Sequence, residues 1–314
     1  MSNMESAELD IKSLREKHYN GTVTQIRKAH EDLMIFRVER DIPFPEYKAG
    51  QYIALGLGYW EARLADCGQD DVDEKKMSKV AKRPYSISHP ILNDEGQLFP
   101  MGFRDFLEFY VVLVRPDDEN PAPVLTPRLF TLEEGDRLNV GKGIVGSFTL
   151  DSFPSTTKTV IFGSTGTGEA PHNHMIHSLL SQGFDGNIVS LICCRYNQDL
   201  GYLDLHRQLE DRYPNYTYVP LSTREPETIN NKVYIQDFLD TERIEEAIGG
   251  PLDSGSTEVY LCGNPDMIGA PEVDKETDER TYPGRKGVIE VLEKKGFRMD
   301  HRKFVGNIHF ENYW

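Results

Sequence analysis

The sequence predicts two domains, an antiparallel β-barrel followed by an α/β domain with a doubly wound parallel sheet. Three observations support this fold class. The chain has 314 residues, about twice the size of an average domain. Short β-type runs broken by Gly, Pro and Asp fill residues 20–150, as in a barrel or sandwich. After residue 155 apolar strands alternate with helical stretches, which indicates a parallel sheet covered by helices on both faces.

The order of the runs gives the domain boundaries. Residues 1–19 are an N-terminal extension, residues 20–154 the barrel domain and residues 155–314 the α/β domain. A charged stretch at 59–82 and a Gly- and Pro-containing loop at 91–106 interrupt the barrel as surface excursions. The expected barrel strands are 21–29, 33–40, 51–58, 84–89, 107–114 and 137–141, and the expected parallel strands are 159–163, 187–194, 216–221 and 258–263.

Bulk composition excludes several classes of function. The formal net charge of -16 repels nucleic acid over the molecule as a whole. No apolar run approaches the roughly 20 residues that span a bilayer, so we expect no membrane insertion. The charged first residues do not form a secretory signal, and we expect a cytoplasmic location.

The cysteines show no metal-binding or disulfide spacing. The chain has four of them, none in a CxxC pair, so we expect no zinc site, iron–sulfur cluster or disulfide framework. A redox cofactor would then be organic. The four are Cys67, Cys193, Cys194 and Cys262.

A glycine-containing turn follows the first strand of the second domain. The strand at 159–163 continues through Gly166, Thr167 and Gly168 into a helical stretch. Glycines let the backbone approach a pyrophosphate, which the free N–H groups of a helix start stabilise. This pattern predicts a dinucleotide site, although such turns also serve simple packing. The histidines that follow have no carboxylate partner fixed by spacing, so we expect no metal at 172, 174 and 177.

A four-residue motif stands on a barrel strand. Arg83, Pro84, Tyr85 and Ser86 are consecutive, and strand alternation places Arg83 and Tyr85 on one face and Ser86 on the other. A cation beside an aromatic ring suits a flavin dinucleotide, with Arg83 at the pyrophosphate and Tyr85 at the flavin. An ordinary half-buried strand is the alternative interpretation.

Together these motifs give the chain a recognisable pattern. Arg-x-Tyr-Ser in the first half and Gly-Thr-Gly-x-x-Pro in the second resemble the ferredoxin–NADP reductase family over about residues 20–314. Further similar segments are LEFYVVLV, VLTPRLFTLEEGDRLNVG, VYLCGNPDMIG and the ending GNIHFENYW, which is like the bacterial branch that ends in Tyr-Trp. Departures are the 59–82 insertion, Ser164 and the expanded loop APEVDKETDERTYPGRKG.

The resemblance implies a noncovalent FAD in the first domain. It places the pyrophosphate near Thr126 and the flavin beside the strand LEFYVVLV, and it gives the terminal aromatic residues a stacking role on the flavin or the adenine. The FAD residues it implies are Arg83, Pro84, Tyr85, Ser86, Tyr110, Val111, Val112, Leu125, Thr126, Pro127, Tyr313 and Trp314.

Residues after the third parallel strand favour NADP over NAD. Thr223, Arg224 and Lys232 offer a hydroxyl and two positive charges to a ribose 2′-phosphate, and Tyr234 offers a ring to the adenine, whereas an NAD site presents an acidic side chain. Ordinary surface charges are the alternative reading. The resemblance adds three sets of residues: Arg195, Gln236 of the Lys-x-Tyr-Ile-Gln element, and Gly166, Thr167 and Gly168.

The family also implies a reaction. Hydride passes between NADP(H) and the flavin N5, and electrons leave singly to ferredoxin or flavodoxin. The resemblance puts Ser86, Cys262 and Glu311 around the reacting atoms, with Gly263 in the Cys-Gly turn. Ser86 would hydrogen-bond N5, Cys262 would pack near the nicotinamide C4 and Glu311 would position the ring or relay a proton. Cys262 could equally be a small buried residue at a strand end.

The sequence leaves two other functions open. One is an NADH-dependent flavin reductase that feeds an oxygenase, and the other is a non-catalytic flavoprotein docking subunit. The lack of a four-cysteine cluster disfavours the first, and the retained motifs disfavour the second. We expect a monomer whose acidic carrier docks on local basic side chains, namely Lys79, Lys82, Lys294, Lys295, Arg298, Arg302 and Lys303.

Overall fold

The computed structural model describes residues 10–70, 72–116, 122–274, 276–277, 279–301 and 305–313. The chain forms two compact units. Unit 1 contains residues up to 47 together with 52–86 and 104–145, and unit 2 contains 48–51, 87–103 and the chain from 146 onward. Relative to the predicted ranges, residues 146–154 and two short segments of the first half pack with the α/β part.

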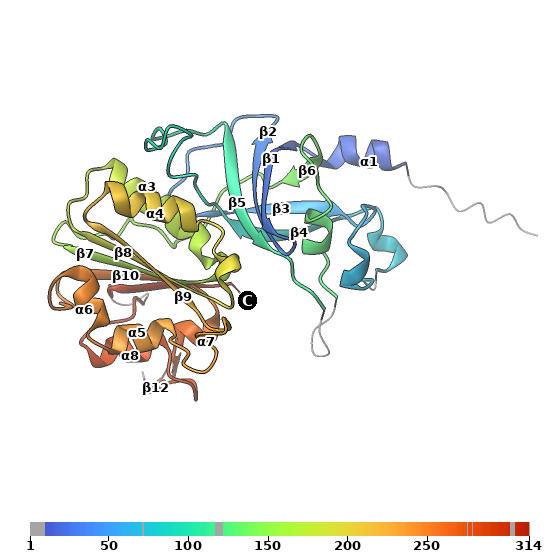
Figure 1. Ribbon diagram of the computed structural model, residues 1–314. Coiled ribbons are helices and arrows are strands. Elements are labelled where there is room, and N and C mark those ends of the chain that lie inside the picture. Colours follow the sequence, from blue (N-terminus) through green and yellow to red (C-terminus); the bar gives the residue numbers. More distant parts are fainter. Residues whose placement is uncertain are drawn as a thin grey trace, which may run out of the picture. The chain divides into compact units, whose positions relative to one another are not determined.

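Unit 1 is built on a six-stranded antiparallel sheet in the order β4-β3-β6-β1-β2-β5. Figure 1 shows β3 and β4 running across the direction of β1, β2 and β5, so the sheet is strongly curved. The antiparallel architecture predicted from the alternating runs is confirmed. The strands are β1 (Gly21–His30), β2 (Leu33–Arg40), β3 (Tyr52–Gly58), β4 (Val80–Ser86), β5 (Phe106–Val112) and β6 (Arg137–Val140).

Apolar side chains across paired strands hold this sheet together. Phe36 of β2 is the register partner of Phe109 of β5, and their ring centroids lie 5.4 Å apart. Both rings are buried, a cross-strand pair of the kind that stabilises antiparallel sheets. Helix α1 (Ile11–His18) precedes β1, so the described part of the N-terminal extension is helical, and a short helix α2 (Thr126–Leu129) precedes β6.

The 59–82 insertion is more than a surface excursion. It contains two single 3₁₀ turns, η1 (Ala65–Cys67) and η2 (Glu74–Lys76). Trp60 and Cys67 within it are buried, so part of the insertion packs into unit 1. Many of the other side chains of the insertion are charged and most are exposed, so its composition does not indicate that Trp60 and Cys67 are buried.

Unit 2 contains a five-stranded parallel sheet in the order β13-β10-β7-β8-β9. Its order confirms the doubly wound parallel sheet predicted for the second half. The strands are β7 (Thr159–Thr165), β8 (Asn187–Cys194), β9 (Tyr216–Ser222), β10 (Thr257–Gly263) and β13 (Ile308–Asn312).

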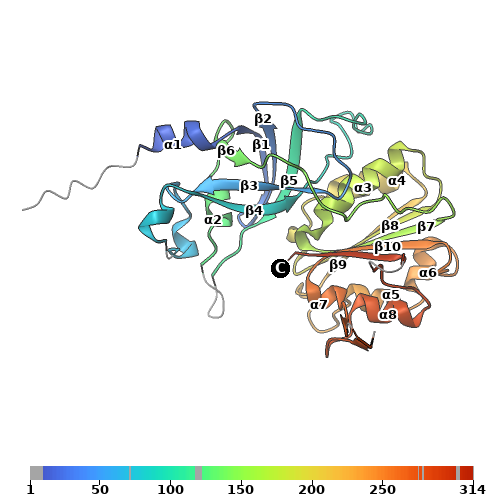
Figure 2. The same ribbon diagram turned by 180° about the vertical axis from the view of Figure 1, so that it is seen from behind.

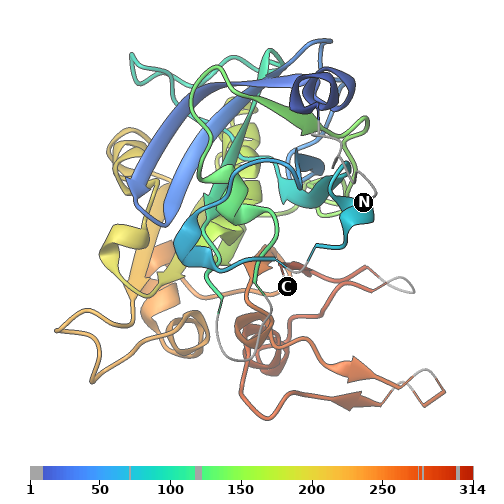
Figure 3. The same ribbon diagram turned by 90° about the vertical axis from the view of Figure 1, so that its right-hand side faces the viewer.

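Helices cover both faces of this sheet (Figures 1 and 2). A small hairpin of β11 (Glu272–Val273) and β12 (Arg280–Thr281) extends from the unit, orange in Figure 3. One face carries α3 (Glu169–Ser181) and α4 (Leu203–Arg212), and the other carries α5 (Ile235–Asp240), α6 (Arg243–Ile248), α7 (Pro265–Ile268) and α8 (Val288–Lys294).

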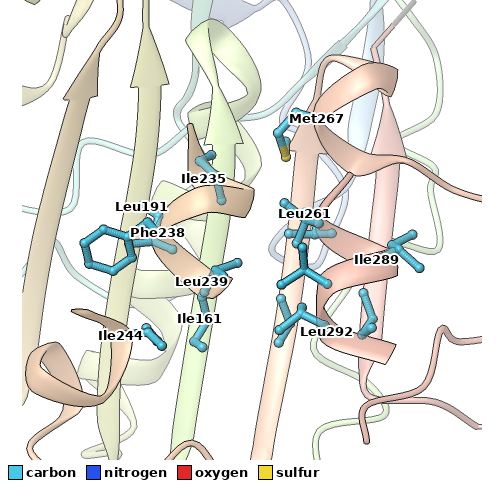
Figure 4. Close-up of a cluster of buried hydrophobic side chains, with 14 of the residues drawn as sticks. Ile161, Leu191, Ile235, Phe238, Leu239, Ile244, Leu261, Met267, Ile289 and Leu292 are labelled. Carbon is cyan, nitrogen blue, oxygen red and sulfur yellow. The ribbon is translucent and has the colours of Figure 1, made fainter. Parts of the chain in front are cut away.

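The sheet strands are apolar on both sides because both faces are buried. Figure 4 shows side chains of α5 and α8, including Phe238, Leu239 and Leu292, meeting Leu191 and Leu261 of the strands. Among the described residues, no helix has the length and apolarity needed to cross a membrane.

Candidate functional site

The glycine loop lies where the strand order of unit 2 reverses. From β7 the chain proceeds outward through β8 and β9 and then returns to the other side of β7 as β10. Ligands of doubly wound sheets bind at this switch point, beyond the carboxyl ends of the strands. The 3₁₀ turn η3 (Gly166–Gly168) joins β7 to α3 at this edge.

The two glycines of the turn have different reasons to be glycine. Gly166 has φ +51°, and a Cβ there would meet nothing within 4 Å. Gly168 packs so closely on β10 that a Cβ would overlap the carbonyl oxygen of Cys262 and lie 2.7 Å from its carbonyl carbon. Open space at Gly166 leaves room for a phosphate, whereas Gly168 fixes the loop against β10. The packing interpretation of the turn therefore applies to Gly168, and the phosphate interpretation of Gly166 stays a prediction.

Cys262, Gly263 and Glu311 come together at the same edge. Strands β10 and β13 pair in parallel with Cys262 opposite Glu311. Gly263 has φ +126°, and a Cβ would overlap Thr165 Oγ1 at the end of β7. The Asn264 N–H donates to that same oxygen at 2.8 Å, and the Tyr313 N–H donates to the Gly263 carbonyl at 3.1 Å. The Cys-Gly turn is thus locked between two neighbouring strands.

Cys262 is a neutral thiol in this setting. Its side chain is fully buried, and burial, followed by the charge of Glu311, raises the pKa of the thiol well above its ordinary value. A neutral sulfur can pack against a ring but does not act as a nucleophile. This agrees with a packing role and with the small-buried-residue interpretation alike.

Candidate phosphate-binding residues follow the outer strands of the same edge. Arg195 comes after β8, and Arg224 after β9, and the Arg224 N–H donates to the Arg195 carbonyl at 2.8 Å. Thr223 is buried and its hydroxyl donates to the Cys194 carbonyl at 3.2 Å, so its proton is already used. Arg224 and Lys232 are exposed, and among the described residues no carboxylate pairs with either.

The remaining predicted residues of this region serve the start of α5. Tyr234 precedes the helix, and its N–H donates to the Asp237 carboxylate at 3.0 Å. The Tyr234 ring is half-buried and Gln236 is buried. Arg195, which follows β8, lies 3.8 Å from Asp199, and the Arg195 side chain is 58% exposed.

In unit 1 most of the predicted flavin residues lie on β4 and β5, the two outermost strands of the sheet order. On β4, Arg83 is exposed, Tyr85 is half-buried and Ser86 is buried. Their register partners on β3 are Leu55, Ile53 and Tyr52, respectively. Arg83 Nη1 donates to the adjacent Lys82 carbonyl at 2.8 Å. Burial raises the pKa of Tyr85, so its hydroxyl stays protonated and can donate.

The other predicted flavin residues lie on β5 and at α2. Thr126 Oγ1 accepts from the Val114 N–H at 3.3 Å. Tyr110, Val111, Leu125 and Pro127 are buried, whereas Val112 and Thr126 are half-buried. The predicted residues Trp314, Arg302 and Lys303 lie outside the described part of the chain.

A buried charge cluster that the sequence did not reveal ties the insertion to α2. Asp70 accepts from Arg128 at 2.8 Å and lies 2.7 Å from Arg63. Arg128 also donates to the Val124 and Tyr59 carbonyls, and Arg63 to the Pro123 carbonyl. Two guanidinium groups therefore share one carboxylate and fix the chain around Thr126. The sequence signal for this cluster is Arg63 and Asp70 within the 59–82 insertion. A solvent-exposed charged loop has the same composition, so the sequence alone does not indicate burial.

Asp70→Asn is expected to lower the free energy of unfolding of unit 1 by about 1.5–3 kcal/mol, because it removes the charged acceptor of two buried arginines. Burial alone would raise the pKa of Asp70, but hydrogen bonds from Arg128 and Arg63 outweigh it and lower the pKa. The stabilisation is therefore present above about pH 4 and is lost as the pH falls. Hydrogen exchange of residues 122–130 at pH 7, compared between Asp70→Asn and the unmodified protein, measures this loss of free energy.

Asp66→Asn is the matched control for this prediction. Asp66 belongs to the same insertion and pairs with Arg115 at 2.5 Å, but its side chain is 60% exposed. Little change in exchange is expected because exposed pairs contribute little. Equal effects of the two substitutions would show that Asp70 has no special role in holding α2.

Comparison with known proteins gives consistent matches over most of the chain. A family model described as an oxidoreductase NAD-binding domain matches residues 162–272. The flavodoxin/ferredoxin–NADP reductase of Shigella flexneri is 30% identical over 253 residues, which cover 79% of this chain and 86% of the relative. The corresponding protein of Buchnera aphidicola subsp. Baizongia pistaciae is 27% identical over 93% of this chain and 97% of its own.

A solved structure extends the match to three dimensions. A ferredoxin NADP+ reductase from Neisseria gonorrhoeae with bound FAD and NADP aligns with a TM-score of 0.66 and 21% identity, covering 95% of this chain and 99% of that one. At this identity the likeness concerns the fold.

Proposed function

Because the chain belongs to the flavodoxin/ferredoxin–NADP reductase family, we propose that it exchanges hydride between NADP(H) and a bound FAD and passes electrons singly to a small redox protein. The observation that carries this proposal is the switch-point edge of unit 2. There the open turn at Gly166 follows β7, Cys262 and Glu311 pair across β10 and β13, and the exposed Arg195 and Arg224 follow β8 and β9. Bound FAD would supply the two-electron to one-electron conversion.

The residues of unit 1 fit a flavin dinucleotide. An exposed guanidinium at Arg83 and a half-buried ring at Tyr85 share one face of β4, which suits a pyrophosphate followed by an aromatic ring system. In our proposal Arg83 binds the pyrophosphate, Tyr85 and Ser86 orient the flavin, and the segment around Thr126 binds the phosphates. Asp70 keeps that segment in place through Arg128.

The residues of unit 2 fit a nicotinamide dinucleotide. The N–H groups of the η3 turn would bind its pyrophosphate. Cys262 would pack its neutral sulfur against the nicotinamide, and Glu311 would hold the ring or move a proton from its place beside Cys262. Arg224 and Lys232 would bind the 2′-phosphate, with Tyr234 against the adenine.

Arg224→Ala and Lys232→Ala are each expected to raise the KM for NADPH by about ten- to a hundredfold while leaving the NADH rate nearly unchanged. A charge-assisted phosphate contact contributes about 1.5–3 kcal/mol, and NADH has no 2′-phosphate to lose. Steady-state kinetics with both nicotinamides measure the ratio. Arg212→Ala serves as the control, because it removes a cation from the end of α4 that precedes β9, away from the carboxyl ends of the strands. Equal losses with NADPH and NADH would contradict the assignment.

Partner, location and oligomeric state are proposals at a finer level. We propose ferredoxin or flavodoxin as the carrier, a monomeric enzyme and a cytoplasmic location. Support for an acidic carrier comes from exposed lysines at 79 and 82 in unit 1. In unit 2 Lys294 is less available, because it pairs with Glu290 at 2.6 Å. Family membership does not favour an oxygenase-feeding NADH reductase or a docking subunit.

Anaerobic stopped-flow absorbance of the purified yellow protein tests the function. NADPH should bleach the flavin faster than NADH, and the reduced enzyme should then reduce added ferredoxin or flavodoxin. Denaturation should release one FAD per chain. The proposal would be overturned if neither NADPH nor NADH reduced the flavin.

A further inference from the structure

Three histidine side chains of unit 2 gather away from the switch-point edge. His174 and His177 are on α3, and His89 belongs to the 87–103 segment that packs with this unit. Each offers a ring nitrogen, and these three atoms all lie within 4.8 Å of one another. His89 and His177 are buried, while His174 is partly exposed.

The fold places these side chains together for identifiable reasons. His174 and His177 are three residues apart and therefore share one face of the helix. Neighbours anchor His89 above that face: Ser88 Oγ lies 2.9 Å from the Tyr202 hydroxyl and accepts from Asn173 Nδ2 at 3.4 Å. The arrangement thus depends on contacts between distant parts of the sequence.

Hydrogen bonding fixes the tautomer of His177. Its Nε2 lies 2.7 Å from the Phe99 carbonyl oxygen, which can only accept, so Nε2 carries the proton. Ser181 Oγ lies 3.2 Å from the same nitrogen. The lone pair is therefore on Nδ1, which is buried and has no hydrogen-bond partner among the residues that the structure describes. A His that donates one N–H to a backbone carbonyl and keeps the other nitrogen bare is oriented as a metal ligand.

Packing alone does not account for the cluster. The rings do stack, with centroids 4.0 Å apart for His89 and His177 and 4.9 Å for His89 and His174. Phe or Leu could fill the same space, whereas a buried ring nitrogen without a partner costs free energy. A bound cation would satisfy that nitrogen.

We propose that His89, His174 and His177 bind a divalent transition-metal ion of the zinc class. Three neutral imidazoles without a carboxylate select Zn²⁺, Co²⁺ or Ni²⁺ rather than Mg²⁺ or Ca²⁺. A three-histidine set leaves a fourth position for water. The ion would clamp the 87–103 segment to α3, and it is independent of the flavin chemistry.

Coordination requires a small rearrangement. Zinc–nitrogen bonds of about 2.0–2.1 Å put neighbouring ligand atoms about 3.4 Å apart in a tetrahedron, and the three nitrogens already lie within 4.8 Å of one another. His89 and His177, whose planes differ by only 22°, must also turn out of their stack to point at one ion. Partly exposed His174 gives solvent access for this closure.

The site is tested with the full-length flavoprotein after removal of metal by chelator. Titration with Zn²⁺ by calorimetry should give one tight site per chain, and Mg²⁺ should give none. Bound Co²⁺ should show the visible absorption of a nitrogen-ligated ion next to the flavin bands. Zn²⁺ should also raise the melting temperature.

Variants separate this site from metal binding elsewhere. His174→Asn, at a partly exposed position, and His177→Phe, which preserves ring packing, should each weaken Zn²⁺ binding at least tenfold and abolish the thermal shift. His18→Asn, in the exposed α1, is the control and should bind as the unmodified protein does. If His177→Phe fails to fold, His174→Asn alone decides. Absence of stoichiometric Zn²⁺ binding, or undiminished binding by His174→Asn, would overturn the proposal.

Discussion

Replacing His206 with leucine is expected to lower the free energy of unfolding of unit 2 by about 1–3 kcal/mol, because it leaves fully buried polar groups without their partner. Glu169, the first residue of α3, and His206 of α4 have no exposed side-chain surface, and His206 Nε2 lies 3.0 Å from Glu169 Oε1. The same oxygen accepts from the Tyr218 hydroxyl at 3.1 Å. Hydrogen-exchange mass spectrometry of β8 and β9 should show exchange about ten- to a hundredfold faster.

Two further variants identify the cause of this loss. Tyr216→Phe removes only the hydroxyl that lies 2.7 Å from His206 Nδ1, and about 1 kcal/mol is expected for one neutral hydrogen bond. The double variant Glu169→Leu with His206→Leu should recover most of the stability, since an apolar pair of similar volume leaves neither of the two side chains as an unsatisfied buried polar group. If the double variant is as unstable as His206→Leu alone, lost packing rather than an unsatisfied Glu169 side chain is responsible.

Local patterns in the sequence predicted the two sheets. Alternating runs such as 33–40 correspond to β2, and continuous apolar runs such as 187–194 correspond to β8. A strand buried on one face alternates apolar and polar residues, whereas a strand buried on both faces is apolar throughout, so both kinds can be predicted from the sequence. The family predicted from the Arg-Pro-Tyr-Ser motif and the glycine turn is confirmed by a relative at 30% identity. The roles of individual site residues stay predictions.

Contacts between distant segments could not be predicted in the same way. Segment 87–103 belongs to unit 2 because its side chains, including Ile91 and Leu92, join the core beside α3. Asp70 reaches Arg128, and His89 reaches His177, through tertiary packing that no periodicity encodes. The opposition of Cys262 and Glu311 depends on the register of two parallel strands, which residue order alone does not fix.

Gly168→Ala is expected to slow flavin reduction by NADPH about a hundredfold, since displacing reacting groups by about an ångström costs that much. The new Cβ would overlap the Cys262 carbonyl oxygen, lie 2.7 Å from its carbonyl carbon and lie 3.1 Å from Gly263 Cα. All three are backbone atoms, so neither partner can turn aside, and the turn must move away from β10. That movement separates the proposed pyrophosphate site from the proposed nicotinamide site. Stopped-flow absorbance of the flavin measures the rate.

Two glycines of the chain separate this collision from the general effect of a methyl group. Gly166→Ala, in the same turn, meets no protein atom within 4 Å and adds the strain of φ +51°, worth about 1 kcal/mol. Because its Cβ enters the space proposed for the phosphate, a higher KM for NADPH is expected, with only a few-fold loss of rate at saturating NADPH. Gly143→Ala in unit 1 meets nothing within 4 Å and should be neutral. FAD content should stay normal in all three, because the proposed flavin residues belong to unit 1. If Gly168→Ala is reduced as fast as Gly166→Ala, close packing of the turn on β10 is not what positions the nicotinamide, and the site must be assigned to other residues.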